Sequence, residues 1–303
     1  MANYLGVSGC VAVNSGTSAL HLALLSSGVG CDDNVIVPVL TFIATANAVS
    51  YTRAKPVFVD VDRETWTVSY IDAIYRLNLR TKAIIPVNIY GVPSYGSNIN
   101  LIYIGDAAES VGSGSYWHND IQCYSFNGNK TMSTGSGGLI VGDNIEEVRE
   151  LADVGRKDGE FNSIGYNYRM NGMQAEMGLI QLPYLDKWVA KKRRFNQIYR
   201  EQLSDIIQFQ EPTPGSNPSW WFTAGLFPEG TDIPGLQNKL AARGVPTRRI
   251  FQPLNQLKPY LSDERFPVAE DIYNRGLCLP SSAMNSEKDI LRVCKTIRGV
   301  VEG

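Results

Sequence analysis

The stretch that decides the fold runs from residue 106 to residue 138. It contains DAAES at 106–110, CYSFNGNKT at 123–131 and GSGG at 135–138. The first segment places Asp106 directly after a short apolar strand predicted at 101–104. A second apolar strand, predicted at 121–124, leads into a polar turn that carries one lysine, Lys130, and then into a run of glycines. An acid and a lysine are therefore expected near the ends of neighbouring strands.

This pair suits a pyridoxal phosphate (PLP) site. Lys130 would form the Schiff base with the cofactor, and Asp106 would pair with the ring nitrogen so that the ring can act as an electron sink. The alternative is a surface lysine in a loop and an aspartate that caps a helix, because single charged residues are common on protein surfaces. The stretch alone leaves both interpretations open.

Two nucleotide-binding motifs are excluded by spacing. A phosphate-binding P-loop requires glycine directly before the lysine and another five residues earlier, but Asn129 and Tyr124 occupy those positions. A dinucleotide-binding fingerprint also fails, because no third glycine follows Gly112-Ser113-Gly114 at the required spacing. Neither an ATPase-type nor a Rossmann-type site is predicted.

The ordered motifs of residues 125–131 and 134–138 resemble the nucleotide-sugar aminotransferases, a PLP-dependent family with the aspartate aminotransferase fold, and within it the perosamine synthases. The similarity extends from Val11 to the C-terminal region. It implies an α/β fold: a large domain over residues 1–186, with a mostly parallel seven-stranded sheet wound by helices. It also implies a connecting helix and a small α+β domain over residues 187–303.

The periodicity of the N-terminal part supports such a sheet independently of the resemblance. Further strands are predicted at 10–13, 35–39, 56–61 and 83–87, and a helix at 70–79 with Ile71, Ile74 and Leu77 on one side. Strands that alternate with helices predict a parallel sheet, whose ligands bind at the carboxyl ends of the strands.

Residues after the first two strands are candidates for cofactor contacts. Gly16, Thr17 and Ser18 open a predicted helix, where free N–H groups and the helix dipole attract anions, although a plain N-cap is the commoner role. Phe42 follows the second strand, and its pattern alone favours the core. The resemblance implies that the first three residues lie beside the cofactor phosphate and that Phe42 stacks on the pyridine ring.

The resemblance also assigns roles within the lysine motif and beyond it. It implies that Ser125 and Asn127 help to hold the phosphate and that Glu109 lies near the ring hydroxyl. The segment 165–170 resembles the one that crosses to the other subunit, so that Asn167 or Arg169 would meet the cofactor phosphate of a partner. This implies a homodimer with shared active sites, whereas an exposed salt bridge is the plain alternative for Arg169.

The remaining elements are expected as follows. A charged helix is predicted at 143–154, with Asp143 or Asn144 as its N-cap, and an apolar helix at 173–182. A basic helix at 186–204 is interpreted as a solvated face without a specific role. A loop is predicted at 212–218, and later elements should form the small domain. Asn88 and Asn255 stand where the family usually has histidine.

Composition excludes several other classes of function. The chain has 303 residues, 44% hydrophobic and 19% charged, with a formal net charge of −2, so neither nucleic acid nor a membrane surface is expected as a partner. Five cysteines without CxxC spacing predict buried thiols in a reducing compartment, and two histidines make a metal site unexpected. No signal pattern or membrane-spanning run is visible, and a cytoplasmic protein is predicted.

The predicted function is a PLP-dependent aminotransferase that acts on a nucleotide-linked 4-keto-6-deoxy sugar. Glutamate is the donor that the resemblance implies, and the amino group would be added at C4. One alternative is a sugar dehydratase of the same fold, although relatives with that chemistry replace the lysine by histidine. A second alternative is a non-catalytic or regulatory homologue, against which the Lys130 and Asp106 pair argues.

Overall fold

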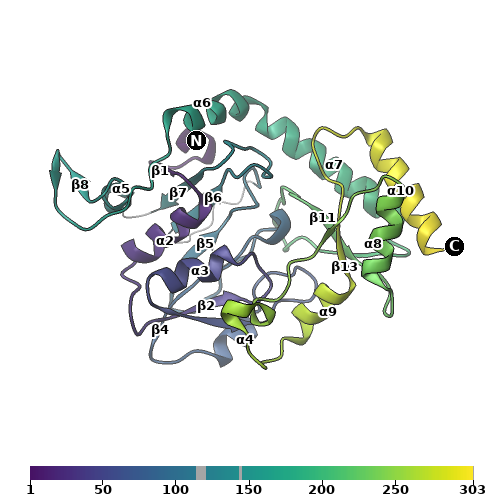
Figure 1. The fold of residues 1–303 in the computed structure, drawn as a ribbon, viewed down its shortest axis with the longest axis horizontal. Helices are drawn as coiled ribbons and strands as arrows, with labels where there is room; N and C mark the ends of the chain where they lie inside the picture. The colour runs from purple at the N-terminus through teal and green to yellow at the C-terminus, as the bar shows by residue number, and fades with distance from the viewer. Residues whose placement is uncertain (114–120, 143–144, 303) are drawn as a thin grey trace.

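A seven-stranded sheet forms the centre of the N-terminal part of the chain (Figure 1). The computed structural model describes residues 1–113, 121–142 and 145–302. The strand order is β1-β7-β6-β5-β4-β2-β3, and β7 alone in this sheet runs antiparallel to its neighbours. The strands are β1 (Cys10–Val13), β2 (Asn34–Pro38), β3 (Lys55–Val59), β4 (Thr81–Ile84), β5 (Ile102–Asp106), β6 (Ile121–Ser125) and β7 (Gly138–Gly142). The predicted mostly parallel sheet is confirmed.

Helices with small and apolar residues pack beside this sheet. The helix α2 contains eight buried residues and lies against β5, β6 and β7. Strands buried on both faces read as continuous apolar runs, as residues 35–38 of β2 do. The other N-terminal helices are α1 (Ala2–Leu5), α2 (Gly16–Ser26), α3 (Ala44–Tyr51), α4 (Tyr70–Tyr75), α5 (Ile145–Ala152) and α6 (Gly172–Gln181), with a short 3-10 turn η1 (Ile89–Gly91).

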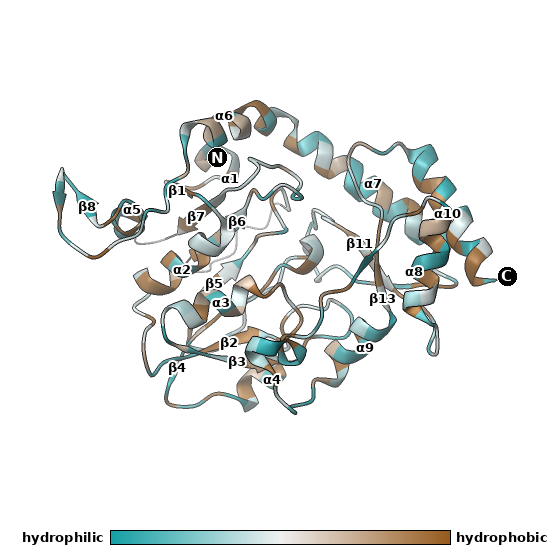
Figure 2. Cartoon of the chain, in the orientation of Figure 1, coloured by the Kyte–Doolittle hydropathy of each residue, from teal (hydrophilic) through white to brown (hydrophobic). Residues whose placement is uncertain are grey.

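A second, four-stranded antiparallel sheet forms in the C-terminal part, in the order β10-β11-β13-β12. Its strands are β10 (Gln208–Phe209), β11 (Thr223–Leu226), β12 (Arg248–Arg249) and β13 (Gly276–Leu279). The helices around it are α7 (Leu185–Leu203), α8 (Ile233–Ala242), α9 (Pro267–Arg275) and α10 (Glu287–Val301). A separate apolar core joins α7, α8 and α10 to this sheet. Teal and brown alternate along α7 and α10 in Figure 2, as expected for helices with one buried side.

Between the strands of the two sheets, the sequence forms a hairpin and a junction of helices. The hairpin pairs β8 (Arg156–Lys157) with β9 (Glu160–Phe161) and projects from the molecule (Figure 1). A 3-10 turn, η2 (Leu182–Tyr184), joins α6 to α7, and two more, η3 (Leu254–Gln256) and η4 (Lys258–Tyr260), precede α9. The N-cap predicted at Asp143 or Asn144 lies outside the described residues.

One prediction about local structure is wrong, and one strand was not predicted. The helix expected at 70–79 ends at Tyr75, because the Asn78 side chain accepts a hydrogen bond from the Arg80 N–H and forms a turn into β4. Its apolar residues do not pack: Ile71 is 73% exposed. The antiparallel strand β7 was not predicted, because glycines on both sides shorten its apolar run to residues 139–141.

The predicted thiols are only partly buried. All five cysteines are free; Cys123, Cys278 and Cys294 are buried, but Cys10 is half-buried and Cys31 is exposed in the turn after α2. The basic helix was predicted to present a solvated face, and this prediction is wrong at one residue. Lys192 of α7 is 5% exposed, and it lies against the second sheet. No helix among the described residues is both long and apolar enough to cross a membrane.

Candidate active site

The candidate site lies where β5 and β6 end. These strands are parallel neighbours, with Asp106 paired to Cys123, so the residues that follow both strands meet at one edge of the sheet. Asp106 is the last residue of β5 and Ser125 the last of β6. Lys130 follows in a turn closed by a hydrogen bond from its N–H to the Asn127 carbonyl (2.9 Å). The fold thereby brings the predicted acid and lysine into one cavity, with a volume of about 380 Å³.

Lys130 is held between an acid and an aromatic ring. Its Nζ donates to Glu109 Oε1 at 3.2 Å and lies 3.9 Å from the centre of the Trp221 ring. The Trp221 Nε1–H donates to the Asn129 carbonyl at 2.8 Å, which fixes the ring against the lysine turn. The lysine side chain is 12% exposed, so its amino group faces the cavity from a protected position.

Asp106 is a buried carboxylate with two hydrogen bonds. Oδ2 accepts from Thr45 Oγ1 at 2.8 Å, and Oδ1 accepts from the Ala108 N–H at 3.1 Å. Burial raises the pKa of Asp106 above its ordinary value, and the two hydrogen bonds oppose that rise. A cationic ring N–H beside this group would compensate the buried charge, which is what a protonated pyridine ring offers.

Glu109 is equally buried and links the lysine to the η1 turn. Oε2 accepts from the Tyr90 N–H at 2.8 Å, while Oε1 accepts from Lys130. Burial raises the pKa of Glu109, and the charge of Lys130 is the largest effect against that rise. Tyr90 has φ +54°, in the left-handed region that aromatic residues rarely adopt. This backbone conformation directs the Tyr90 N–H toward the glutamate.

A cradle for an anion forms between α2 and the end of β6. Ser15 caps α2 by accepting from the Ser18 N–H at 3.0 Å, which leaves the first N–H groups of the helix available. A Cβ on Gly16 would lie 2.9 Å from Ser125 Cβ, so only glycine lets the two segments approach this closely. Gly16, Thr17, Ser125 and Asn127 line the cavity.

Phe42 offers an uncovered ring at the same cavity. It is 56% exposed, and its ring centre lies 5.9 Å from that of Phe251. An exposed aromatic face in a concave site suits stacking on a flat ligand. Cradle, buried acid, lysine and aromatic ring together fit PLP: Asp106 would hold the ring nitrogen, Lys130 the aldehyde carbon, and the α2 cradle the phosphate.

The DegT/DnrJ/EryC1/StrS aminotransferase family model matches residues 1–298. The chain belongs to this family. It is 37% identical to the GDP-perosamine synthase of Escherichia coli O157:H7, covering 94% of the chain and 84% of that protein. It is 36% identical to the GDP-perosamine synthase of Caulobacter vibrioides, covering 99% and 88%. The crystal structure of DesV from S. venezuelae superposes with a TM-score of 0.92 at 28% identity, covering all of this chain and 87% of DesV.

Family membership and the aminotransferase fold are thus confirmed, and the family is one of PLP-dependent enzymes. Of the residues predicted at the site, three do not line the cavity: Ser18, Asn167 and Arg169. Ser18 does not line it, because its hydroxyl donates to Asn14 Oδ1 at 2.6 Å and its N–H is taken by Ser15. The place of Ser18 beside the cofactor phosphate, which the resemblance implies, stays a prediction.

Asn167 and Arg169 lie away from the cavity in their own chain. Both are exposed, and Arg169 Nη1 lies 2.7 Å from Asp153 Oδ1. The segment runs beside β1, with the Asn14 N–H donating to the Tyr168 carbonyl at 2.7 Å. The salt bridge considered as the plain alternative for Arg169 is present, and a contact with a partner's site stays a prediction.

The two asparagines at the family's histidine positions hold turns. Asn88 is buried; its Nδ2 donates to Ser110 Oγ, and its Oδ1 accepts from the Ser94 N–H, both at 2.8 Å. Asn255 is also buried, and its Nδ2 donates to the Glu264 carbonyl at 2.7 Å. Neither side chain lines the cavity, and each stabilises its loop through hydrogen bonds.

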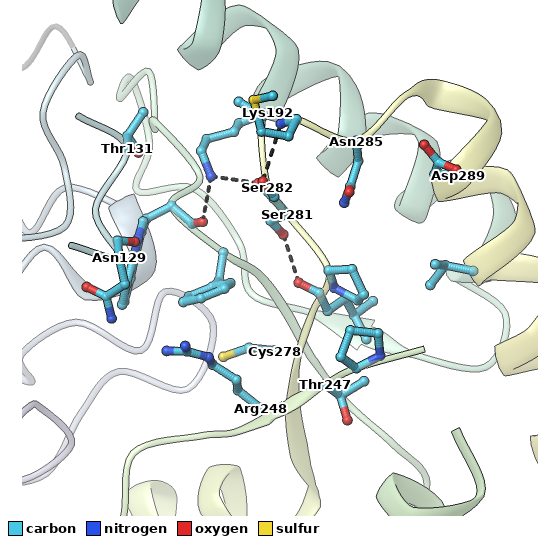
Figure 3. A pocket seen from close by; sticks show the side chains of 18 of the residues that line it. Asn129, Thr131, Lys192, Thr247, Arg248, Cys278, Ser281, Ser282, Asn285 and Asp289 are labelled. Carbon is cyan, nitrogen blue, oxygen red and sulfur yellow. Dashed lines mark hydrogen bonds between the residues drawn. The ribbon is translucent and has the colours of Figure 1, made fainter. Parts of the chain in front are cut away.

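Three residues of the site were missed from the sequence. Trp221 contacts Lys130 directly, and Arg248 lines the same cavity from the second sheet. Lys192 lines a neighbouring cavity of about 760 Å³, which shares Asn129, Lys130, Trp221 and Arg248 with the first (Figure 3). We call the first the inner cavity and the second the outer cavity. Trp221 follows another tryptophan, Arg248 precedes another arginine in the short strand β12, and Lys192 belongs to a basic helix. None of these patterns by itself indicates a site.

Proposed function

We propose that this chain transfers an amino group from an amino acid to C4 of a nucleotide-linked 4-keto-6-deoxy sugar, with PLP as cofactor. Glutamate is the donor that we expect. The observation that carries the proposal is the meeting of Lys130, Asp106 and Glu109 in one cavity beside the α2 cradle. The similarity to two GDP-perosamine synthases over nearly the whole chain supports the choice of sugar class.

PLP, when bound, supplies the electron sink that stabilises the carbanion formed in transamination. In this chain, Lys130 Nζ would bond to the cofactor and then move the proton between the donor's Cα and the cofactor carbon. Asp106 would keep the proton on the ring nitrogen. Glu109 would hold Lys130 in position and accept from the ring hydroxyl. Trp221 would exclude water beneath the lysine.

We also propose a cytoplasmic homodimer with shared active sites. The helix α6 has no buried residue in the single chain, and Met173, Leu179 and Ile180 are each at least 60% exposed. An apolar surface of this kind supports a protein interface. The exposed segment that carries Asn167 and Arg169 leads directly into α6, so a partner docked there would receive it. The separate C-terminal core supports the division into domains at residues 186 and 187.

The test is an amination assay with the purified chain, PLP, glutamate and a panel of GDP-, UDP- and dTDP-linked 4-keto-6-deoxy sugars. We expect a 4-amino sugar product from at least one of them and none from the Lys130→Ala variant. Formation of product by that variant at a near-normal rate would contradict the assignment of Lys130. Absence of product with every sugar, from protein that binds PLP, would contradict the proposed substrate.

The two alternative functions are not favoured. A dehydratase of this fold would carry histidine in place of Lys130, and the lysine is present and faces the inner cavity. A non-catalytic homologue would not require a buried acid and a lysine in the same cavity as an anion cradle. An absorbance band near the visible edge after addition of PLP would distinguish an enzyme that bonds its cofactor from a binding protein that does not.

A further inference from the structure

Gln181 is the last residue of α6, and its side chain reaches the lysine turn, residues 126–134, which carries Lys130. Its Nε2 donates to the Ser133 carbonyl at 2.5 Å, and its Oε1 accepts from the Ser133 N–H at 3.1 Å. Nε2 also donates to the Met177 carbonyl at 3.0 Å, one helical turn earlier, which fixes the amide on α6. One side chain therefore binds both backbone groups of Ser133, and we call these two bonds the amide clamp.

The backbone of Ser133 relies on this clamp. A planar amide carries a donor and an acceptor side by side, which matches the N–H and the carbonyl of one residue. Among the described residues, each of these two Ser133 groups has the Gln181 amide as its one partner. The next residue differs, because the Thr134 N–H donates to the Phe126 carbonyl at 2.9 Å within the turn itself. Ser133 is thus the point at which the lysine turn is fastened to α6.

The main chain of the lysine turn is anchored on both sides of Lys130. One residue earlier, the Asn129 carbonyl accepts from the Trp221 Nε1–H at 2.8 Å. Two residues later, Met132 is 1% exposed and belongs to an apolar cluster with buried residues of α7. The amide clamp follows directly after Met132. The lysine side chain therefore projects into the inner cavity from a base that neighbouring elements hold in place.

We infer that Gln181 is a positioning residue for Lys130, an inference that rests on the proposed function. The Lys130 amino group has to reach both the cofactor and the proton that it moves, so the rate depends on where the turn places its main chain. A displacement of about 1 Å can lower a rate about a hundredfold. Gln181 also lines the outer cavity, so a direct contact with a substrate is the alternative that the experiments distinguish.

Hydrogen exchange of the PLP-loaded protein, without substrate, tests the clamp itself. Gln181→Leu keeps most of the volume of the side chain and removes both hydrogen bonds. We expect the Ser133 amide to exchange at least about tenfold faster than in wild type, because its N–H loses its partner. Mass spectrometry with fragmentation to single residues measures this rate. Wild-type protection of Ser133 in the variant would overturn the inference.

The half-reaction with glutamate alone tests the consequence for Lys130. We expect the rate constant at saturating glutamate to fall at least about tenfold in Gln181→Leu, because the lysine is displaced. The half-saturating glutamate concentration should change less than about threefold. A raised half-saturating concentration with an unchanged rate constant would overturn the inference, because it would indicate a direct contact with the donor. An unchanged rate constant in a protein with a loosened turn would overturn it as well.

Gln181→Glu supplies a rescue that depends on pH, and it decides the question alone if Gln181→Leu does not fold. A protonated carboxyl group has one donor and one acceptor, as the amide has, whereas the ionised form has acceptors only and would face the Ser133 carbonyl. Protection of Ser133, relative to wild type at the same pH, should therefore fall as the pH rises from about 5 to about 8. The same relative protection at both pH values would overturn the inference.

Gln197→Leu is the matched control. Gln197 is exposed on α7, outside both cavities, where its Nε2 donates to Glu201 Oε1 at 2.8 Å. This variant should keep the wild-type exchange at Ser133 and the wild-type half-reaction, and equal losses in both variants would overturn the inference. Failure of the wild type with every sugar, while the glutamate half-reaction still depends on Gln181, would contradict the proposed sugar substrate and support the positioning role.

Discussion

At the scale of single residues, the site depends on buried charges that are matched in pairs. The two carboxylate oxygens of Asp106 accept hydrogen bonds from the Thr45 hydroxyl and the Ala108 N–H, and a cation beside them would neutralise the buried charge. We predict that Asp106→Asn lowers kcat at least about a hundredfold, because a neutral amide cannot hold the proton on the ring nitrogen. Steady-state amination kinetics measure this, and a loss of less than about tenfold would assign the role to another group.

The residues that were predictable from the sequence share one property: each follows a strand of the parallel sheet. Asp106, Glu109, Ser125 and Lys130 could be placed together because parallel strands deliver their following residues to one edge. Trp221 and Arg248 could not, because Trp221 lies in the segment before β11 and Arg248 in β12 of the second sheet, and nothing local indicates that either faces the lysine. The burial of Lys192 could not be predicted either, because it stands in a run of basic residues, and such runs are usually solvated.

At the scale of elements, the η1 turn and the segment before β11 are packed backbone to backbone. Gly91 has φ +92°, and a Cβ there would lie 2.6 Å from the Trp221 nitrogen and 2.8 Å from the Trp220 nitrogen. We predict that Gly91→Ala lowers the free energy of unfolding by roughly 2–4 kcal/mol, through strain and a clash that backbone atoms cannot relieve.

Gly230→Ala is the control for that change, measured by the same chemical denaturation. Gly230 has φ +80° but nothing within 4 Å of a Cβ, so its substitution introduces the conformational strain without the clash. It should cost about 1 kcal/mol. Equal losses for the two variants would show that the contact between η1 and residues 220–221 does not constrain the fold.

The burial of Lys192 in α7 predicts a dependence of stability on pH. Burial lowers the pKa of Lys192 from 10.5 to about 8, so between these values the unfolded chain binds more protons than the folded one. The contribution of this group to the free energy of unfolding therefore rises with pH through that window, by roughly 3 kcal/mol. Below about pH 8 both states are protonated and the contribution is constant.

Lys192→Met removes this titration while keeping most of the length of the side chain. We predict that the difference in unfolding free energy between wild type and variant grows in favour of wild type as the pH rises from about 8 to about 10. Denaturant unfolding at several pH values measures it. Parallel curves for the two proteins would show that Lys192 keeps an ordinary pKa in the folded chain.

At the scale of the whole molecule, the mostly parallel sheet follows from the alternation of strands and helices, whereas the exposed surfaces could not be predicted in this way. We propose that a second subunit covers the exposed apolar residues of α6 and the segment before it. We predict that Lys130→Ala and Arg169→Ala chains, each inactive or weak alone, regain activity when mixed. In a heterodimer with shared sites, one site holds both intact residues and the other lacks both.

Light scattering and a tag on each chain establish that heterodimers form in that mixture. Restored activity of up to about a quarter of the wild-type value is expected, because about half of randomly paired dimers are mixed and each has one intact site. A mixture that stays inactive although heterodimers are present would contradict the sharing of sites. An active monomer would contradict it more directly.

The central claim is that Lys130 is the residue that bonds to the cofactor, and one measurement tests it directly. The wild-type chain is loaded with PLP, reduced with borohydride to fix any carbon–nitrogen double bond, digested and analysed by mass spectrometry. The account predicts one pyridoxyl-modified peptide, with the modification on Lys130, and none from Lys130→Ala treated in the same way. Modification of a different lysine, or an unmodified Lys130 in fully loaded protein, would contradict it.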